Sequence, residues 1–212
     1  MSTQTPTEKP VEKENNGTVN GHIPEIPEVI PDEQPSEKPA KTGVQLSDFF
    51  FTDGTKAHYK GEGNEFAELD IEVVQVNKHY FVVYENNGGS YLRKIYKVEE
   101  HKIITLEEQP VDFEQPLPTL NEIVAMQPIG VYLEEPFTEG AKFGDWTIVQ
   151  TEDAVETPYK TFEKAIVVEM KEENFVNRKY FVQGYGEVKR ESIMNMGEGE
   201  FVVTSSLESI AK

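Results

Sequence analysis

The sequence predicts a mainly β fold of the β-rich α+β class, built from two antiparallel β-meander repeats with one short helix and preceded by a disordered N-terminal tail. Residues 80–98 and 165–189 carry this prediction, because both contain a Val-Val pair followed ten residues later by Arg-Lys and then by an apolar or aromatic pair. The two copies are offset by 85 residues. The matching positions are Val82-Val83, Arg93-Lys94 and Ile95-Tyr96 in the first copy, and Val167-Val168, Arg178-Lys179 and Tyr180-Phe181 in the second.

Residues 1–43 have the composition of a linker. They contain no Phe, Trp or Tyr but seven of the thirteen prolines. Such a segment cannot bury enough apolar surface to offset the entropy lost on ordering it. We therefore predict a disordered, partly polyproline II linker over residues 1–43 and one folded domain over residues 44–212. Within that domain we expect the two repeats at about 44–109 and 129–204, joined by a segment with a short helix near 120–127.

The charge balance excludes one class of partner. The chain carries 39 acidic and 20 basic residues, a net charge of −19. Nucleic-acid binding requires a basic surface, and this balance does not provide one. The same sign argues against electrostatic docking on anionic lipid. We favour a solvated acidic face that keeps the protein soluble; attraction of cations or of a basic partner is the alternative.

The compartment is predicted from the ends and the composition of the chain. There is no cysteine, no apolar run approaches the ~20 residues that span a bilayer, and MSTQTPTEKP lacks the apolar core of a signal peptide. Two explanations fit: a cytoplasmic protein with a long tail, or a chain whose signal segment has been replaced by Met1. We favour the second, because a linker reaching roughly 100 Å would carry a lipid-anchored domain past a cell wall. The predicted location is extracytoplasmic, anchored or secreted.

The first repeat is expected to contain short strands and tight turns. We predict strands near residues 55–59, 66–76, 79–84, 91–98 and 102–107 from their alternation of apolar and polar residues. Phe49, Phe50 and Phe51 are consecutive, so they cannot all face inward on one strand. We expect either a strand buried on both faces or an exposed apolar lip that contacts a ligand.

Two local motifs give sharper predictions. Asn86-Asn87-Gly88-Gly89 is expected to form a hairpin turn, because Asn and Gly tolerate positive φ; a phosphate cradle would need a helix after the glycines. Thr119 and Glu122 have the spacing of a capping box, so a helix should run from Leu120 to about Gln127 and end before Pro128.

The second repeat is expected to begin near Gly130 and to continue through the meander at residues 165–189. The single tryptophan, Trp146, is expected to anchor the core or its edge, with its N–H satisfied. We expect Ser205 to Lys212 to form a brief helix or a fraying tail.

Residues 155–189 resemble a pattern of bacterial, Gram-positive cell-envelope lipoproteins: V-x-T-P-x-G-T-F, an aliphatic strand, a turn, Y-[YF] and G-x-G-x-V-K. Here the matching residues are Val155, Thr157-Pro158, Thr161-Phe162, Ile166-Val167-Val168, Tyr180-Phe181, Gly184, Gly186 and Val188-Lys189, and Lys160 stands at the usual Gly. The resemblance covers about 35 residues well. It implies a curved sheet or half-barrel like that of lipoprotein carriers, and an extracytoplasmic, membrane-tethered domain that binds an apolar ligand or another envelope protein. The single predicted helix also leaves a flatter two-sheet arrangement open.

The sequence shows no catalytic or metal signature. No two of His22, His58, His79 and His101 have the spacing of a local metal pair, and there is no G-x-S-x-G motif. Pairs of glutamates are frequent enough to arise by chance, so an envelope hydrolase is the least favoured hypothesis. We predict no cofactor and no metal.

We therefore predict a non-enzymatic, extracytoplasmic binding or interaction domain, monomeric and tethered to the envelope through a lipid anchor outside this chain. Its partner is an unidentified envelope protein or an apolar ligand; a carrier or sensor of a lipid-like molecule is the alternative. Candidate ligand contacts are aromatic, since an aromatic-lined groove is the functional alternative to a packed core. They are Phe49, Phe50, Phe51, Tyr132, Tyr159 and Tyr185.

Overall fold

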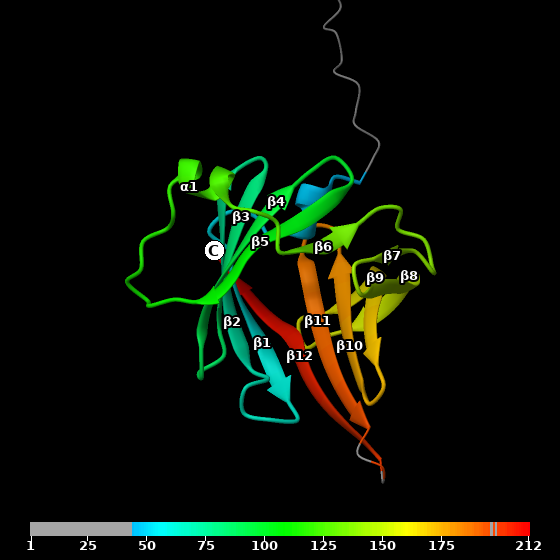
Figure 1. Cartoon of the computed structure of the whole chain (residues 1–212). Helices are drawn as coiled ribbons and strands as arrows, with labels where there is room; N and C mark the ends of the chain where they lie inside the picture. Colours follow the sequence, from blue (N-terminus) through cyan, green and yellow to red (C-terminus); the bar gives the residue numbers. More distant parts are fainter. Residues whose placement is uncertain (1–43, 196, 198) are drawn as a thin grey trace, which may run out of the picture. The chain divides into compact units, whose positions relative to one another are not determined.

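The computed structural model describes residues 44–195, 197 and 199–212. The predicted linker, residues 1–43, lies outside the described residues. Within them the predicted fold class is confirmed: one antiparallel sheet of twelve strands is accompanied by a single short α-helix and one 3-10 turn (Figure 1).

Turns or short loops join most consecutive strands, and a longer connection that contains the helix joins β5 to β6. They are the 3-10 turn η1 (Leu46–Phe49), β1 (Lys56–Glu62), β2 (Leu69–Asn77), β3 (Tyr80–Asn86), β4 (Tyr91–Val98), β5 (Lys102–Pro110), α1 (Leu120–Ala125), β6 (Gly130–Glu134), β7 (Lys142–Phe143), β8 (Trp146–Glu156), β9 (Thr161–Glu172), β10 (Phe175–Val182), β11 (Gly186–Asn195) and β12 (Glu200–Ala211).

The sheet rolls into a nearly closed barrel. Its strand order is β6-β5-β4-β3-β2-β1-β12-β11-β10-β9-β8-β7, so every pair of neighbours is consecutive in the chain except β1 and β12. Strands β1–β6 form one half and β7–β12 the other; the halves curve toward each other, with β6 beside the second half (Figure 1). The edge strands β6 and β7 contact each other without pairing in the sheet. The twist of antiparallel strands produces this curvature.

The repeated stretches form equivalent hairpins. The first is β3–β4 and the second is β9–β10. The predicted hairpin turn at Asn86-Asn87-Gly88-Gly89 is confirmed: the Asn87 side-chain oxygen accepts from the Ser90 amide at 2.8 Å, and Gly88 has φ +77°. Strand β6 falls within the range predicted for the second repeat and pairs with β5, so it extends the first half of the sheet.

Side chains that alternate along the strands build two cores. The larger core fills the barrel interior and contains residues from both halves, among them Val73, Phe81, Ile148 and Phe181. The smaller core lies on the outer face of β3, β4 and β5, and consists of Val82, Ile95, Ile104, Leu106 and Ile123. Because Ile123 comes from α1, the helix covers the outside of the first half of the sheet rather than the interior.

The predicted capping box of this helix is confirmed. The Thr119 hydroxyl accepts from the Glu122 amide at 3.4 Å, and the Glu122 carboxylate accepts from the Thr119 amide at 2.7 Å. The helix ends at Ala125 rather than near Gln127. Met126 already has extended backbone angles, and Pro128 disfavours helical angles at Gln127.

Two predictions about the ends of the domain are wrong. Phe49, Phe50 and Phe51 form neither a strand nor an exposed lip: a 3-10 turn followed by extended chain directs all three into the core. Residues 205–211 form neither a helix nor a fraying tail. They belong to β12, where Ser209 lies opposite His58 of β1. Local sequence patterns cannot reveal a strand partner that lies about 150 residues away in the chain.

Replacing Ile123 with Ala should detach the helix from the outer core. Ile123 is 0% exposed, so the substitution should lower the free energy of unfolding by about 2–4 kcal/mol in urea titrations. Val124→Ala is the matched control on the same turn; Val124 is 58% exposed, and its loss should cost about 0.5 kcal/mol or less. Equal effects of the two substitutions would contradict this placement of α1.

Candidate functional site

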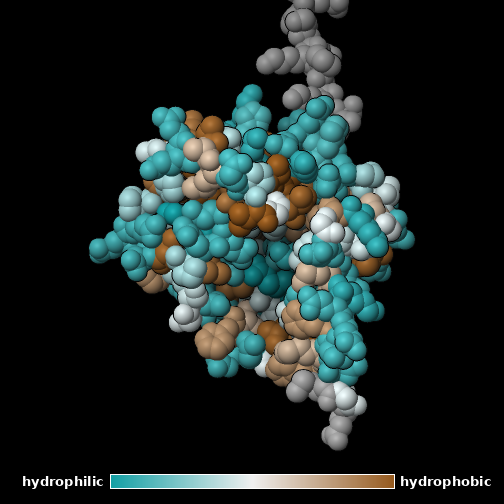
Figure 2. All heavy atoms as spheres, viewed as in Figure 1, coloured by the Kyte–Doolittle hydropathy of each residue, from teal (hydrophilic) through white to brown (hydrophobic). Residues whose placement is uncertain are grey.

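A cavity of about 220 Å³ lies inside the barrel, between the two halves of the sheet. Aromatic, aliphatic and charged side chains all line it. Figure 2 shows the molecule hollowed at the centre of this face, with hydrophilic residues deep in the hollow and hydrophobic ones above them. The charged lining residues are Glu85, Lys94, Glu108, Lys179, Glu187 and Arg190.

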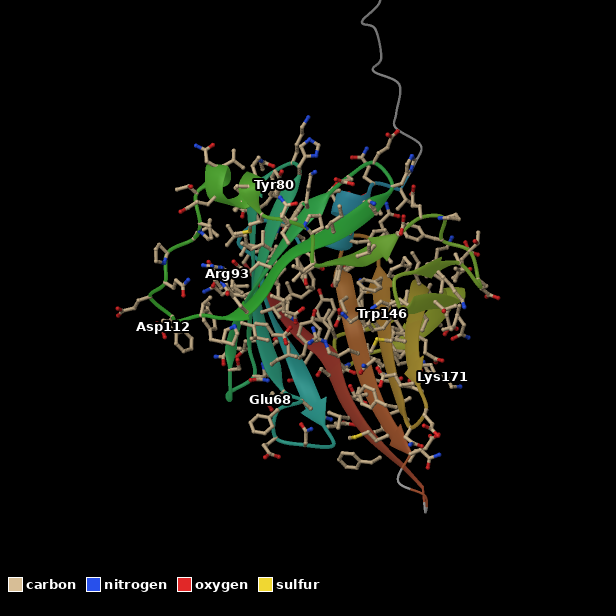
Figure 3. All side chains as sticks on the ribbon, viewed as in Figure 1. Glu68, Tyr80, Arg93, Asp112, Trp146 and Lys171 are labelled. Carbon is tan, nitrogen blue, oxygen red and sulfur yellow. The ribbon has the colours of Figure 1, made fainter. Side chains whose placement is uncertain are left out.

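The repeated Arg-Lys pair places one lysine from each half in this cavity. Side chains alternate along a strand, so Arg and Lys face opposite ways. In β4, Lys94 lines the cavity, whereas Arg93 donates to Glu107 at 2.6 Å and to the Pro116 carbonyl at 3.2 Å, beneath the loop after β5 (Figure 3). In β10, Lys179 lines the cavity in the same way.

Arg178 completes the parallel between the repeats. It donates to Glu169 at 2.8 Å and to Glu191 at 3.2 Å, and none of these three residues lines the cavity. The two copies of the repeat therefore also share their side-chain directions. In each copy the arginine pairs with glutamate away from the cavity, and the lysine points into the cavity.

A β-bulge brings two further charges inward. Glu187 and Arg190 are three residues apart on β11 and would face opposite sides of a regular strand. The register shifts at this point, because Tyr180 lies opposite Lys189 while Phe181 lies opposite Glu187, leaving Val188 as an extra residue. The bulge reverses the alternation, and both side chains line the cavity.

These charges form a network that joins the two halves of the sheet. Arg190 donates to both oxygens of Glu85 at 3.0 Å, and its Nε donates to Glu187. On the first half, Lys94 pairs with Glu85 at 3.0 Å and with Glu108 at 3.3 Å. Bidentate pairing of this kind is the strong form of a carboxylate–arginine contact.

The network keeps its carboxyls ionised. Burial by itself raises the pKa of Glu187, but attraction to Arg190, Lys179 and Lys94 outweighs burial and lowers the pKa to about 2. The pKa of Glu85 is also far below its usual range, because attraction to Arg190 and Lys94 exceeds the effect of burial.

Lys179 has fewer partners than the other cations. Its ammonium lies 3.4 Å from Glu187, its one ion pair among the residues that the structure describes. It also lies over two rings, 5.1 Å from the centre of Tyr132 and 5.2 Å from that of Trp146. Figure 3 labels Trp146, at the start of β8 in the second half of the sheet. Burial lowers the pKa of Lys179.

An aromatic cluster covers part of the cavity. Phe50, just after η1, stacks on Phe81 with ring centres 4.4 Å apart, and it also contacts Tyr96 and Tyr132. The turn between β10 and β11 holds this segment, because the Gly184 amide donates to the Asp48 carbonyl at 2.6 Å.

Gly186 explains the Gly-x-Gly spacing of this turn. It has φ +83°, and a Cβ there would lie 2.6 Å from the Phe49 carbonyl oxygen. Only glycine permits both the backbone angle and this close approach. The Gly-x-Gly turn thus holds residues 48–50 beside the cavity.

The structure gathers five of the six candidate ligand contacts around the cavity. Phe49, Phe50, Phe51, Tyr132 and Tyr185 line it. The sixth, Tyr159, does not: it is 41% exposed and lies near Lys160 and Tyr185 at the surface. Sequence reasoning missed the charged lining residues, although the repeated Arg-Lys pair was a signal for Lys94 and Lys179.

His58, His79 and His101 lie outside this site. His58 contacts Asp70 at 2.8 Å and Glu208 at 3.5 Å, and His101 contacts Glu135 at 3.0 Å. No group of three potential metal ligands occurs among the residues that the structure describes. In the same part of the chain, no helix has the length and apolar character needed to cross a membrane.

Comparisons with known proteins find likeness in structure alone. No protein-family model matches the chain, and no curated protein matches it. The fold is similar to that of a predicted exported protein with a YmcC-like fold from Bacteroides fragilis, with TM-score 0.51 and 14% identity over 80% of this chain and 100% of that one. It is equally similar to a predicted lipoprotein from Parabacteroides distasonis, with TM-score 0.51 and 14% identity over 79% of this chain and 99% of that one.

At 14% identity these comparisons show a similar fold and no more. The first neighbour is a predicted exported protein and the second a predicted lipoprotein. The finer resemblance to Gram-positive lipoproteins and to lipoprotein carriers stays a prediction.

Replacing Arg190 with Met should destabilise the domain strongly. The substitution leaves Glu187 buried without its main partner and breaks the link to Glu85, so we expect a loss of about 3–5 kcal/mol in the free energy of unfolding. Arg190→Lys should recover part of this loss, because its ammonium keeps a positive charge beside Glu85 and Glu187 although it cannot pair with both oxygens of Glu85 at once. An Arg190→Lys variant as unstable as Arg190→Met would refute the charge argument.

The stability of the domain should fall in acid through Glu187. Its pKa is lower in the folded state than its ordinary value of 4.5, so its contribution is complete above pH 4.5 and is lost as pH falls toward about 2. We expect the free energy of unfolding of Glu187→Gln to fall less steeply over this range, by up to about 1.4 kcal/mol per pH unit. Glu173→Gln, at an exposed turn, is the control and should follow the unsubstituted chain.

Proposed function

We propose that this chain is a non-enzymatic, extracytoplasmic binding domain whose ligand occupies the cavity inside the barrel. The observation that carries the proposal is the cavity itself: both halves of the sheet contribute a lysine to it, and aromatic rings form much of its wall. Ligand sites are typically concave, mostly apolar and fitted with a few placed polar groups.

Binding is favoured over catalysis by the state of the buried carboxyls. A carboxylic acid that donates a proton at neutral pH needs a raised pKa. The pKa values of Glu85 and Glu187 are lowered instead, because Arg190 pairs with both carboxylates. Their arrangement suits a rigid charged wall and not an acid–base pair.

The proposed location rests on the fold and on the sequence. One structural neighbour is a predicted exported protein and the other a predicted lipoprotein, and the composition of residues 1–43 is that of a tether. We propose that the domain is held at the cell envelope by a lipid anchor. The same location would give it access to an envelope protein as partner.

A lipid-like ligand is the less favoured alternative. The aromatic cluster at Phe50 supports an apolar ligand. Six charged side chains in the cavity wall oppose a purely apolar one, because a chain of methylene groups offers these charges no hydrogen bonds.

Filling the cavity should abolish binding. Val83 lines the cavity from β3, so Val83→Phe should remove the space for a ligand, and Val131→Phe offers a second filling variant from β6. We expect native mass spectrometry of the full chain from a bacterial host to show an added mass that disappears on denaturation and is absent from both variants. Val124→Phe, on the exposed side of α1, is the matched control and should retain it.

An adduct that persists in both filling variants would place the ligand elsewhere and contradict the proposal. A clean mass for every variant would count against a tightly held small molecule. It would direct attention to an envelope protein as the partner.

A further inference from the structure

We infer that Lys179 is the anion-binding position of the cavity, and that the ligand is a small carboxylate with a flat apolar body. This inference rests on the proposed function, because it requires a ligand in the cavity. Its basis is the charge balance of the cavity, the unused donors of Lys179 and the rings beside it.

The cavity wall is far less negative than the chain as a whole. Lys94, Lys179 and Arg190 lie among the carboxylates of Glu85, Glu108 and Glu187, three charges of each sign. Glu108 is half exposed at its contact with Lys94, where solvent weakens the pairing. In a chain with a net charge of −19, the charged lining of the cavity is therefore balanced and does not repel an added carboxylate.

Lys179 is the cation with the most unused capacity. An ammonium has three donors, and Lys179 has one ion pair, at 3.4 Å, among the residues that the structure describes. Arg190, by contrast, donates from Nε, Nη1 and Nη2 to Glu85 and Glu187. Lys94 pairs with two carboxylates. An anion entering the cavity would therefore meet free donors at Lys179 before any other cation.

The side chains around Lys179 and the cavity volume indicate the shape and size of the ligand. The rings of Tyr132 and Trp146 lie within 5.2 Å of its ammonium, and Tyr132 continues into the cluster of Tyr96 and Phe50. A flat apolar group bound through its carboxylate would lie against these rings. The volume of about 220 Å³ is smaller than the roughly 300–1,000 Å³ of pockets for drug-sized ligands. The ligand is accordingly small.

The test compares acids with their neutral and cationic analogues. The probes are benzoate, phenylacetate, indole-3-acetate and hexanoate, each with its primary amide and the corresponding amine, titrated calorimetrically into the full chain. The fluorescence of Trp146, the one tryptophan of the chain, reports on the cavity for the probes that lack an indole ring. We expect at least one acid to bind at least about tenfold more tightly than its amide, because its charge is paired with a hydrogen-bonding ammonium.

Substitutions then assign this preference to one side chain. Lys179→Met and Lys179→Gln should each abolish the preference for the acid over the amide, and Lys179→Arg should keep part of it. Lys189→Met is the matched control, since Lys189 pairs with Glu191 away from the cavity. It removes the same charge from the chain and should leave the preference unchanged.

The outcomes separate the inference from the proposed function. Amides or amines that bind as tightly as the acids, or a preference that survives loss of Lys179, would overturn the inference while leaving a cavity ligand in place. A preference lost equally in Lys189→Met would show a general charge effect and also overturn it. Acids that bind Val83→Phe undiminished would place binding outside the cavity and defeat both. No binding of any probe would overturn the inference, and the adduct experiment would still decide the proposed function.

Discussion

The bidentate ion pair between Glu85 and Arg190 is the contact on which the interior of this barrel depends. It joins β3 of one half of the sheet to β11 of the other across the cavity. A buried charge without a partner is costly, so each residue of the network constrains the next. Glu187 and Lys94 extend the pairing on either side. The interior is therefore held at a defined width instead of collapsing into a uniformly apolar core.

Strand geometry explains how so many charges reach one space. Regular alternation sends Lys94 and Lys179 inward and their arginine neighbours away from the cavity. The bulge at Val188 interrupts alternation once and adds Arg190 to the same side as Glu187. The aromatic segment after η1 then covers the charged wall, held by Gly184 and Gly186. A site that combines apolar rings with a charged wall suits an amphiphilic molecule.

The parts of this fold that local chemistry decides could be predicted from the sequence. The hairpin turn at Asn86–Gly89 and the capping box at Thr119 each depend on hydrogen bonds between residues no more than four positions apart. The alternation of apolar and polar residues along the strands is a local pattern as well. The rest depended on distant contacts. Ser205 and its neighbours form a strand because β1 pairs with them. The position of the bulge at Val188 cannot be predicted from the residue pattern, so the sequence could not show that Arg190 faces the cavity. Five of the six aromatic candidates do line the cavity, but its charged wall was missed.

The pairing of β1 with β12 also bears on how the chain reaches this structure. All other ladders join strands that are consecutive in the chain, so each half can assemble from local pairings, most of them closed by short loops. The β1–β12 ladder joins residues such as Lys56 and Ala211, which makes it the contact of greatest sequence separation in the sheet. Contacts of this kind slow folding because the entropy of closing the long loop is lost first. We therefore expect the halves to form before they join. Until they join, the charges of the future cavity remain in water, where leaving them unpaired costs little.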